Sequence, residues 1–460
     1  MASQSVPVQK LREKVDADFA RTIDELKALV AVPGIAWAEF DPADLARSAG
    51  LVAALAESSA YPNIEILSAK GPDGASGAPA VVARRLPKPG WPTVMLYAHH
   101  DVQPPGDAAL WTSGPFTPEE RDGRLWGRGA ADDKSGIVTH LAAFRCLTDV
   151  LGDRFGLGVT LFIEGEEESG SATLGAFLAE HAALLKSDII VVADSGVWKI
   201  GVPALTTSLR GLVDGTIELR SLNHGLHSGT YGGPVLDAVT LLAKLLATFH
   251  DATGAVTVEG LVSADTAERD IDEGTFRADA SVPPGVRLAG TGTITSRLWT
   301  KPALAIIGLD APAVATASNT LVPTATAKFS LRIAPGDSPE NAMDAIRRHV
   351  RLHTPAGAEV TVTSGRASMP YAADLSSPAV GDALWSMEEA WGSAPVRVGV
   401  GGSIPLVSAL AGHFPEAQIL ITGAEDPDSR AHGEDESVHL DELRRSILAE
   451  VLLLSKLNER

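Results

Sequence analysis

Histidines and acidic residues follow four apolar segments of this 460-residue sequence, at the point where each segment ends. The four segments and the residues that follow them are Thr93–Ala98 with His99 and Asp101, Gly158–Ile163 with Glu164–Glu168, Ile189–Ala193 with Asp194, and Gln418–Thr422 with a loop that reaches His432. Imidazole nitrogens and carboxylate oxygens are ligands that suit zinc, and also manganese or cobalt. The residue types at these four ends therefore predict a metal site.

The acidic residues are also crowded along the chain. Glu166, Glu167 and Glu168 are consecutive, and Asp132-Asp133 form a second pair. Carboxylates that share a cleft ionise at a high energetic cost unless a cation compensates their charge. Any one of these residues alone is explained more simply as a solvated loop acid or a helix cap. Their gathering at four segment ends favours a dinuclear metal site.

A sheet must bring the four ends together. Apolar strand-like runs alternate with segments of helical periodicity, such as Ser135–Leu147. This alternation is typical of an α/β fold with a mostly parallel sheet that is flanked by helices and buried on both faces. Ligands of such sheets bind outside the carboxyl ends of the strands. We therefore expect the candidate ligands at one edge of the sheet.

The middle of the chain has a different pattern. Ser208–Arg220 and Ala325–Ile333 alternate like strands with one exposed face, and Pro234–Phe249 and Pro339–His353 are amphipathic helices. Two strands that are each followed by a helix indicate a small inserted α+β domain of the ferredoxin-like kind. We place this insertion at 207–372, which leaves 1–206 and 373–460 as a discontinuous catalytic domain.

The composition of the chain limits the kinds of partner and the cellular compartment that we expect. The net charge of −20 argues against nucleic acid or an anionic membrane as a partner. Cys146 is the only cysteine, which excludes an internal disulfide and disfavours a thiolate zinc site. The sequence has no run of about 18 apolar residues, and its N-terminal segment lacks the apolar core of a secretory signal. The expected location is the cytoplasm.

Seven short motifs follow one another along the chain. They are Tyr97–Pro104 (YAHHDVQP), Trp126–Lys134 (WGRGAADDK), Glu164–Ser171 (EGEEESGS), Val192–Ser195 (VADS), Leu226–Gly229 (LHSG), Gly401–Pro405 (GGSIP) and Ala431-His432. In sequence and in order these motifs resemble those of the M20 family of zinc peptidases, and the closest branch is that of the carnosinase-like and cytosolic non-specific dipeptidases. The motifs cover nearly the whole predicted architecture, so the resemblance implies a zinc-peptidase catalytic domain with an inserted lid and dimerisation domain.

The resemblance implies two Zn²⁺ ions per subunit, with Mn²⁺ or Co²⁺ as possible substitutes. The implied ligands are His99 and Asp194 for one ion, Glu168 and His432 for the other, and Asp132 for both. Asp101 would orient His99 from behind and raise its basicity. Glu167 would be the general base for a water that bridges the two ions. A cis peptide bond after Asp132 is implied as well.

Two points of the ligand set stay open. The run of three glutamates allows a register shift of one residue, and Ser169 directly after Glu168 favours Glu167 as the base. His432 is followed by Gly-Glu-Asp-Glu, where the family more often has an Asn-Glu pair. His100 and His439 are therefore rivals for its place, although alternation would turn His100 to the other face of its strand.

Other matching positions concern the substrate. Arg332 resembles the family's clamp on the substrate's free carboxylate, a task for which a planar guanidinium is suited. Asn319 and Ser403 are weaker candidates for the same pocket. His227 resembles the family histidine that stabilises the oxyanion from the partner subunit, which implies a homodimer formed through the inserted domain.

The predicted function is hydrolysis of amide bonds in dipeptides or short peptide-like substrates with a free carboxylate. The enzyme class is a dinuclear zinc metallopeptidase of the dipeptidase or carboxypeptidase type. The first alternative, an N-acyl amino acid or N-succinyl-diaminopimelate hydrolase, uses the same metal chemistry, but Gly127–Lys134 and Gly401–Pro405 favour the dipeptidase. The second alternative is a non-catalytic binding protein, which the presence of every predicted ligand and of the base disfavours.

Overall fold

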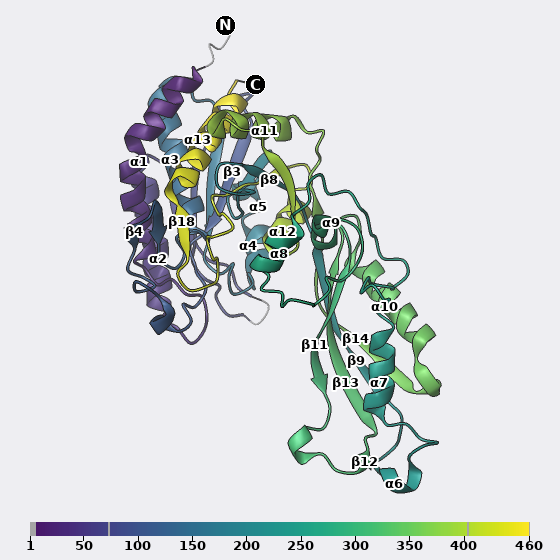
Figure 1. Cartoon of the computed structure of the whole chain (residues 1–460). Helices are drawn as coiled ribbons and strands as arrows, with labels where there is room; N and C mark the ends of the chain where they lie inside the picture. Colours follow the sequence, from purple (N-terminus) through teal and green to yellow (C-terminus); the bar gives the residue numbers. More distant parts are fainter. Residues whose placement is uncertain (1–5, 72–73, 403, 460) are drawn as a thin grey trace. The chain divides into compact units, whose positions relative to one another are not determined.

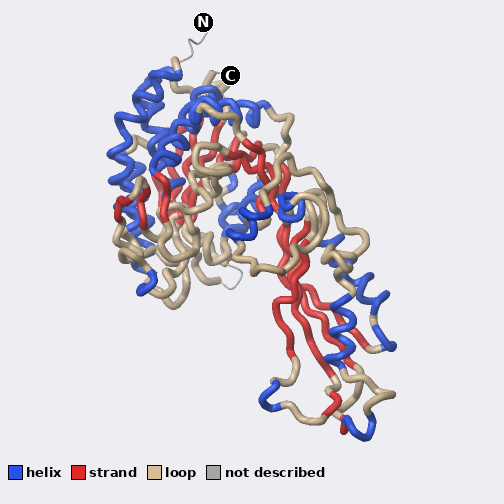
Figure 2. Tube along the Cα trace, viewed as in Figure 1, coloured by secondary structure: helices blue, strands red, loops and turns tan. Residues whose placement is uncertain are grey.

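The computed structural model describes residues 6–71, 74–402 and 404–459 (Figure 1, Figure 2). Contacts within the chain divide it into two compact units. Unit 1 comprises Met1–Thr207, Ala373–Val398 and Pro405–Arg460, and unit 2 comprises Ser208–Ala372 and Gly399–Ile404. Each unit has its own hydrophobic core.

Among the described residues, the largest sheet has nine strands and is mixed, with a parallel centre. Its strands, in spatial order, are β1 (Ile64–Leu67), β2 (Ala80–Arg85), β6 (Gly158–Glu164), β3 (Thr93–His99), β7 (Ile189–Val192), β17 (Gln418–Ile421), β8 (Ala204–Leu209) and β15 (Tyr371–Ala372), with β16 (Val396–Val400) also paired to β8. The pairs β6–β3, β3–β7 and β7–β17 are parallel, and the outer pairs β1–β2, β2–β6 and β8–β15 are antiparallel. The predicted α/β class is confirmed. The sheet is parallel at its centre, as predicted, and has antiparallel strands on its outer sides.

Both faces of the central strands are covered. Val94, Leu96 and Ala98 of β3 join the core that also contains residues of α1, α3, α11 and α13. On the other face, the Tyr97 ring meets Phe162 edge to face, and Phe162 stacks on Phe177 of α4. Because alternate residues point to opposite faces, a strand covered on both sides must be apolar throughout. This explains the nearly continuous apolar runs of the sequence.

The helices of unit 1 are α1 (Val8–Val30), α2 (Pro42–Ser58), α3 (Lys134–Leu151), α4 (Leu174–Glu180), α5 (Ala182–Leu185), α11 (Pro378–Trp391), α12 (Pro405–His413) and α13 (Leu440–Leu457), with 3₁₀ turns η1 (Ala108–Leu110) and η2 (Gly152–Arg154). α3 packs against α1 and α13, and α11 also packs against α13. A three-stranded sheet, ordered β18 (Ser437–His439), β5 (Arg124–Trp126) and β4 (Glu119–Arg121), joins the C-terminal part of the chain to the loop after β3.

Unit 2 has the βαββαβ order of a ferredoxin-like fold. Its main elements are β9 (Gly211–Arg220), α7 (Ala238–Ala247), β11 (Ala303–Asp310), β13 (Thr324–Ile333), α10 (Pro339–His353) and β14 (Glu359–Ser368). The antiparallel sheet is ordered β11-β13-β9-β14, and apolar residues of β9 and β13 share a core with α7 and α10. The inserted α+β domain expected from the sequence is thus present, with β11 as a strand that the pattern did not predict.

The shorter elements of unit 2 lie outside that core. They are β10 (Leu226–His227), α6 (Ser228–Tyr231), α8 (Glu273–Asp279), α9 (Ile294–Trp299), η3 (Val314–Thr316), β12 (Thr320–Leu321) and η4 (Pro355–Gly357). β10 and β12 pair with each other. Figure 1 shows β12 and α6 together at one end of the unit 2 sheet.

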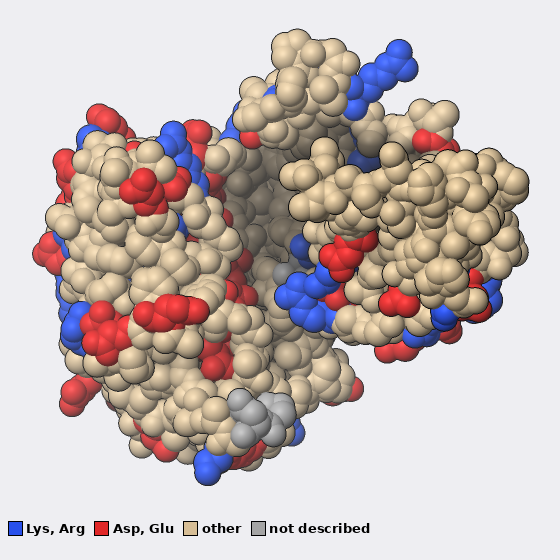
Figure 3. All heavy atoms as spheres, turned by 90° about the horizontal axis from the view of Figure 1, so that it is seen from below, with Lys and Arg blue, Asp and Glu red and all other residues tan. Residues whose placement is uncertain are grey.

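Two surface properties bear on partners. Among the residues that the structure describes, no helix is both long enough and apolar enough to cross a membrane. On the face drawn in Figure 3, acidic side chains are spread over the surface with basic side chains among them, in a chain whose net charge is −20.

Candidate metal centre

The four strand ends meet at one edge of the large sheet. β6, β3, β7 and β17 are neighbours and run parallel, so their carboxyl ends lie side by side. His99 is the last residue of β3 and pairs with Glu164 at the end of β6. Asp194 follows Val192, the last residue of β7, by two positions. The parallel order thus brings together residues that are far apart in the sequence.

Two groups of possible metal ligands share one carboxylate. His99, Asp132 and Asp194 form the first group and Asp132, Glu168 and His432 form the second, with the ligand atoms of each group within 4.8 Å of one another. Nε2 of His99 lies 3.1 Å from Oδ1 of Asp132, and Nε2 of His432 lies 3.0 Å from Oδ2. His432 Nε2 is also 3.1 Å from Oε2 of Glu168. The two carboxylate oxygens of Asp132 therefore face different histidines, one from each candidate ligand group.

The pKa values of these residues indicate a site that attracts cations. Burial alone would lower the pKa of His99, but hydrogen bonds and charges from Asp101 and Asp132 outweigh it and raise that pKa well above its usual value. Hydrogen bonds to Asp132 and Glu168 raise the pKa of His432 to about 10. Burial, with the charges of Asp132 and Glu168, raises the pKa of Asp194 to about 7.

The surroundings of Asp194 test whether the residues present fit a bound metal ion. Its side chain makes no hydrogen bond or ion pair with the part of the chain that the structure describes, although burial and nearby carboxylates disfavour its charge. A cation held by the shared groups would relieve that cost. The oxygen and imidazole donors also match the ligands that zinc, manganese and cobalt accept. The residues present therefore fit a bound metal.

Asp101 links the histidine strand to the glutamate loop. Its backbone oxygen lies 3.0 Å from Nδ1 of His99, whereas its carboxylate is 3.5 Å from that nitrogen. The carboxylate oxygens instead accept the backbone N–H groups of Glu167 and Glu168, both at 3.1 Å. Because Nδ1 of His99 donates to a carbonyl, Nε2 is left to act as a ligand.

The three consecutive glutamates have three different environments. Glu166 accepts hydrogen bonds from the backbone of Ala78 and from both the backbone and the hydroxyl of Thr173, which makes it a loop brace. Glu168 accepts from the backbone and side-chain amides of Gln103 at 3.1 and 2.7 Å. Glu167 receives no such donor from the described residues, and burial, opposed by the His99 charge and reinforced by nearby acids, raises its pKa to about 9.

Glu436 was not singled out from the sequence, yet it anchors the loop that carries Asp132. It is fully buried. Its Oε1 accepts the backbone N–H groups of Ala131 and Asp132. Its Oε2 accepts the backbone N–H of Gly129 and an N–H of the Arg128 guanidinium group. The four distances range from 2.6 to 3.1 Å. The expected cis peptide between Asp132 and Asp133 is confirmed.

The loop after β17 carries His432 and is fixed by a buried ion pair. Arg124 donates to both carboxylate oxygens of Asp426, at 3.2 and 2.8 Å, and both side chains are buried. His432 itself has φ of 64°, a backbone conformation that is uncommon outside glycine. The same loop carries Glu425, an acid that the sequence pattern did not indicate. Its pKa is raised well above its usual value by burial and by the carboxylates of Asp132 and Asp194.

The two rival histidines lie elsewhere. Nε2 of His100 donates to the backbone oxygen of Pro79 at 2.8 Å, on the face expected from strand alternation. Nδ1 of His439 accepts the backbone N–H of Asp441 at the start of α13. Within the described ranges, neither histidine belongs to a candidate ligand group.

The remaining predicted residues belong to unit 2. Nδ1 of His227 accepts the backbone N–H of Gly229 at 3.1 Å, so Nε2 carries the proton of the neutral ring. The backbone oxygen of Asn319 accepts the N–H of Ser228 at 2.9 Å, which places Asn319 beside His227. Arg332 lies near the other end of β13, opposite Leu212. Ser403 lies outside the described residues.

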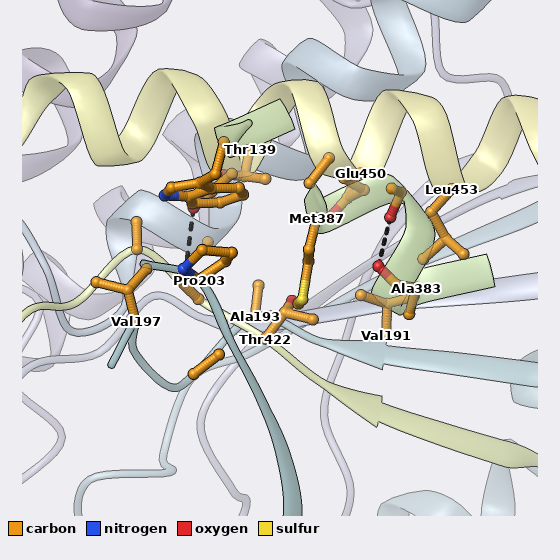
Figure 4. Close-up of a pocket in the computed structure, with 18 residues that line it drawn as sticks. Thr139, Val191, Ala193, Val197, Pro203, Ala383, Met387, Thr422, Glu450 and Leu453 are labelled. Carbon is orange, nitrogen blue, oxygen red and sulfur yellow. Dashed lines mark hydrogen bonds between the residues drawn. The ribbon is translucent and has the colours of Figure 1, made fainter. Parts of the chain in front are cut away.

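A small cavity of about 30 Å³ lies in the core of unit 1 between the sheet and helices α3, α11 and α13 (Figure 4). Three of the hydroxyls that line it donate to backbone oxygens, since Thr139 donates to Ser135, Ser386 to Ala383 and Ser446 to Gly423. The carboxylate of Glu450 in its wall contacts His140 at 2.9 Å. The cavity is therefore a packing space, distinct from the groups of candidate ligands.

The parallel sheet brings two candidate ligand groups with a shared carboxylate to one edge, an arrangement suited to metal-dependent hydrolysis. Residues 95–456 match the model of Peptidase family M20/M25/M40. The chain is 37% identical over 368 residues to cysteinylglycine-S-conjugate dipeptidase of Corynebacterium striatum, covering 79% of this chain and 80% of that protein. It is 25% identical over 398 residues to beta-Ala-His dipeptidase of Rattus norvegicus, covering 82% and 80%. The chain belongs to peptidase family M20/M25/M40.

Solved structures agree on the fold. The di-peptidase Dug1p of Saccharomyces cerevisiae superposes with a TM-score of 0.76 at 20% identity, covering 99% of this chain and 100% of that chain. Human carnosine dipeptidase 1 has a TM-score of 0.74 at 22% identity, covering 99% and 100%. The family match and the relative from Corynebacterium striatum confirm the resemblance inferred from the motifs.

Proposed function

We propose that this protein is a dinuclear metal-dependent dipeptidase that hydrolyses dipeptides or short peptide-like substrates with a free carboxylate. The observation that carries the proposal is the pair of ligand groups joined by Asp132, with the donor-free carboxylate of Glu167 in the adjacent loop. The relatives named above act on cysteinylglycine conjugates and on beta-Ala-His, which supports a dipeptide substrate.

The ligand roles follow the two groups. His99 and Asp194 would hold one ion and Glu168 and His432 the other, and Asp132, which belongs to both groups, would serve both ions. We expect Zn²⁺ in both positions, with Mn²⁺ or Co²⁺ as possible substitutes. Such ions, when bound, polarise the scissile carbonyl and make water more acidic. Asp101, Gln103 and Glu436 keep the ligands in place through the hydrogen bonds described above.

Glu167 is proposed as the general base. Its carboxylate is not held by a described donor, while the neighbouring Glu166 and Glu168 are both held, so Glu167 is the member of the run that is left to exchange protons. It accepts a proton from the attacking water and delivers it to the leaving amine.

Arg332 is proposed to bind the substrate's carboxylate, with Asn319 and Ser403 as weaker candidates for the same task. Burial lowers the pKa of Arg332, and the charge of Arg366 lowers it further. Burial and the charge of Arg332 likewise lower the pKa of Arg210, to about 10. Like charges that are gathered in this way favour an anion between them. A carboxylate matches the planar guanidinium group.

The separation of His227 from Arg332 supports a site shared by two chains. β12 ends at Leu321, just before β13 begins at Thr324, so His227 and Asn319 lie at the Thr324 end of the sheet. Arg332 is eight residues further along β13, which is about 26 Å in a strand. An extended dipeptide spans only about 7 Å. His227 and Arg332 of one chain therefore cannot hold the same dipeptide.

We accordingly propose a homodimer formed through unit 2, in which His227 donates from Nε2 to the oxyanion formed at the partner's site. β11 is an outer strand of its sheet and exposes Ile307 and Leu309, with 53% and 54% of their surface accessible. An open edge with exposed apolar side chains is suited to pairing with a second copy.

The direct test is a hydrolysis screen of dipeptides, tripeptides, and N-acetyl and N-succinyl amino acids with zinc, manganese and cobalt. We expect the highest kcat/KM with dipeptides, loss of activity after chelation, and recovery when metal is returned. Full activity in a verified metal-free preparation would refute the metal chemistry. A clear preference for N-acyl substrates would replace the dipeptidase by an acyl amino acid hydrolase.

A further inference from the structure

The backbone oxygen of Tyr97, near the end of β3, joins three segments of unit 1. It accepts the backbone N–H of Ala193, the residue that follows β7, at 3.0 Å. It also lies 2.9 Å from Nε2 of His140, which belongs to α3. A single carbonyl oxygen thus connects the end of β3, the end of β7 and the helix α3.

These three segments carry the three members of the first ligand group. His99 is the last residue of β3, Asp194 lies two residues after the end of β7, and Asp132 lies two residues before α3. Metal ligands bind an ion tightly only when they are held close to the geometry that the ion requires. The contacts of the Tyr97 oxygen therefore bear on the spacing of this group. Glu168 and His432 of the second group come from loops that other contacts hold, as described above.

Glu450 fixes the orientation of the His140 ring. Nδ1 of His140 lies 2.9 Å from each carboxylate oxygen of Glu450 on α13, and both side chains are buried (Figure 4 labels Glu450). A carbonyl oxygen only accepts hydrogen bonds, so Nε2 must donate to Tyr97. By holding Nδ1, Glu450 keeps the ring in the orientation that allows this donation.

Stability alone does not account for the buried pair of His140 and Glu450. Buried ion pairs seldom stabilise a fold more than apolar side chains of similar volume would. What the pair adds is a directed contact with β3. A second contact joins the same parts, because a carboxylate oxygen of Asp133 accepts the backbone N–H of His99 at 3.3 Å. The first part of α3 and the residue before it are thus bonded to two successive peptide groups of β3.

We propose that His140, oriented by Glu450, is a positioning residue for the first metal ion, the one assigned to His99, Asp132 and Asp194. Its hydrogen bond to the Tyr97 oxygen sets the spacing of the three segments that carry these ligands. This inference rests on the proposed function and deepens it. Loss of the hydrogen bond should weaken the first ion on the order of 10-fold, as for other residues that orient ligands from behind. The second ion should be retained.

An apolar double variant removes the pair without leaving a buried charge. His140→Leu/Glu450→Leu should unfold, in its metal-free form, at a urea concentration equal to or above that of the wild type. It should nevertheless lose affinity for the first ion. If this variant does not fold, His140→Asn/Glu450→Gln serves the same purpose, because the short asparagine amide keeps its contact with position 450 but does not reach Tyr97.

A second double variant, His140→Gln/Glu450→Gln, should rescue the first ion. The amide of a glutamine reaches the region that Nε2 of a histidine occupies, so it can donate to the Tyr97 oxygen and accept from the amide at position 450. Glutamine and asparagine at position 140 differ by one methylene group, yet they should differ in metal affinity. A role confined to packing would give no such difference.

The measurement is the Zn²⁺ content per chain against a graded series of a competing chelator. The apolar variant should release one ion at a chelator concentration on the order of 10-fold lower than the wild type. A further substitution identifies the ion that remains: adding His432→Ala should remove it, whereas adding Asp194→Ala should not. Thr139→Val is the control, since Thr139 is buried beside His140 on α3 but donates within its own helix. It should release both ions like the wild type.

The outcomes separate this inference from the function on which it rests. Wild-type release of both ions by the apolar variant, equal weakening of both ions, or failure of the glutamine variant to restore the first ion would each overturn the positioning role of His140. All three leave a dinuclear dipeptidase intact. A wild-type chain that binds no Zn²⁺ would overturn the proposed function itself.

Discussion

Glu436→Gln is the substitution whose consequence can be worked out most fully. The Glu436 carboxylate is buried and receives four donors, two on each oxygen. Glutamine has nearly the same shape but presents one oxygen and one amide N–H₂ group, which is itself a donor. Whichever way the amide turns, two of the four donors face another donor. The buried guanidinium of Arg128 also loses its carboxylate partner.

The cost follows from these lost partners. A buried donor without an acceptor costs about 1–3 kcal/mol, and breaking a buried ion pair costs about 3–5 kcal/mol. The lost interactions share one carboxylate, so they do not add. We therefore expect Glu436→Gln to lower the free energy of unfolding by about 3–5 kcal/mol. Because Glu436 also orders the backbone of Asp132, affinity for metal should fall about 10–100-fold.

Urea denaturation of the metal-free protein measures the first effect, and metal titration against a competing chelator measures the second. Glu434→Gln is the matched control, because Glu434 lies two residues earlier and its side chain has no partner among the described residues. The control should change the free energy of unfolding by less than about 0.5 kcal/mol. If Glu436→Gln unfolds at the wild-type urea concentration and binds metal with wild-type affinity, the anchoring role assigned to Glu436 is wrong.

Three further predictions concern the proposed roles. Glu167→Gln should retain the metals and lose several orders of magnitude in kcat, whereas Glu168→Gln should also weaken metal binding; swapped outcomes in metal analysis and kinetics would move the register by one residue. Arg332→Ala should abolish the preference for a dipeptide over its C-terminal amide, and Arg332→Lys should restore it poorly because lysine lacks the planar fork; equal wild-type rates on the two substrates would remove Arg332 from the site. Refolding an equal mixture of Glu167→Gln and His227→Ala should return roughly a quarter of wild-type activity, since half of the dimers are mixed and each mixed dimer has one intact site; no recovery in confirmed mixed dimers would contradict a shared site.

The parts of the fold that could be predicted are those with a strong periodic signal. The central strands are buried on both faces, so they appear as apolar runs with ligands at their ends. β11 was not predicted because it is an outer strand with exposed Ile307 and Leu309, and its apolar residues follow no clean alternation. The residues that suit an edge strand depend on what packs against its open side, and the local sequence carries no information about that partner.

Residue types at strand ends indicated His99, Asp194 and the run of glutamates, whereas Asp132 and the choice of Glu168 within the run came from the family resemblance. Neither source indicated the supporting acids. Glu425, Glu434 and Glu436 stand in one acidic loop and are chemically identical in the sequence. What separates them is the number of donors that each meets, and the donors of Glu436 lie about 300 residues earlier in the chain. Only the fold supplies that information.

The net charge of the chain acts on the substrate before it binds. A chain of net charge −20 repels anions at a distance, which disfavours N-acyl amino acids because they carry a net negative charge. A dipeptide at neutral pH is a zwitterion with no net charge, so it meets no such repulsion. The long-range field of the chain therefore favours a dipeptidase over an acyl amino acid hydrolase.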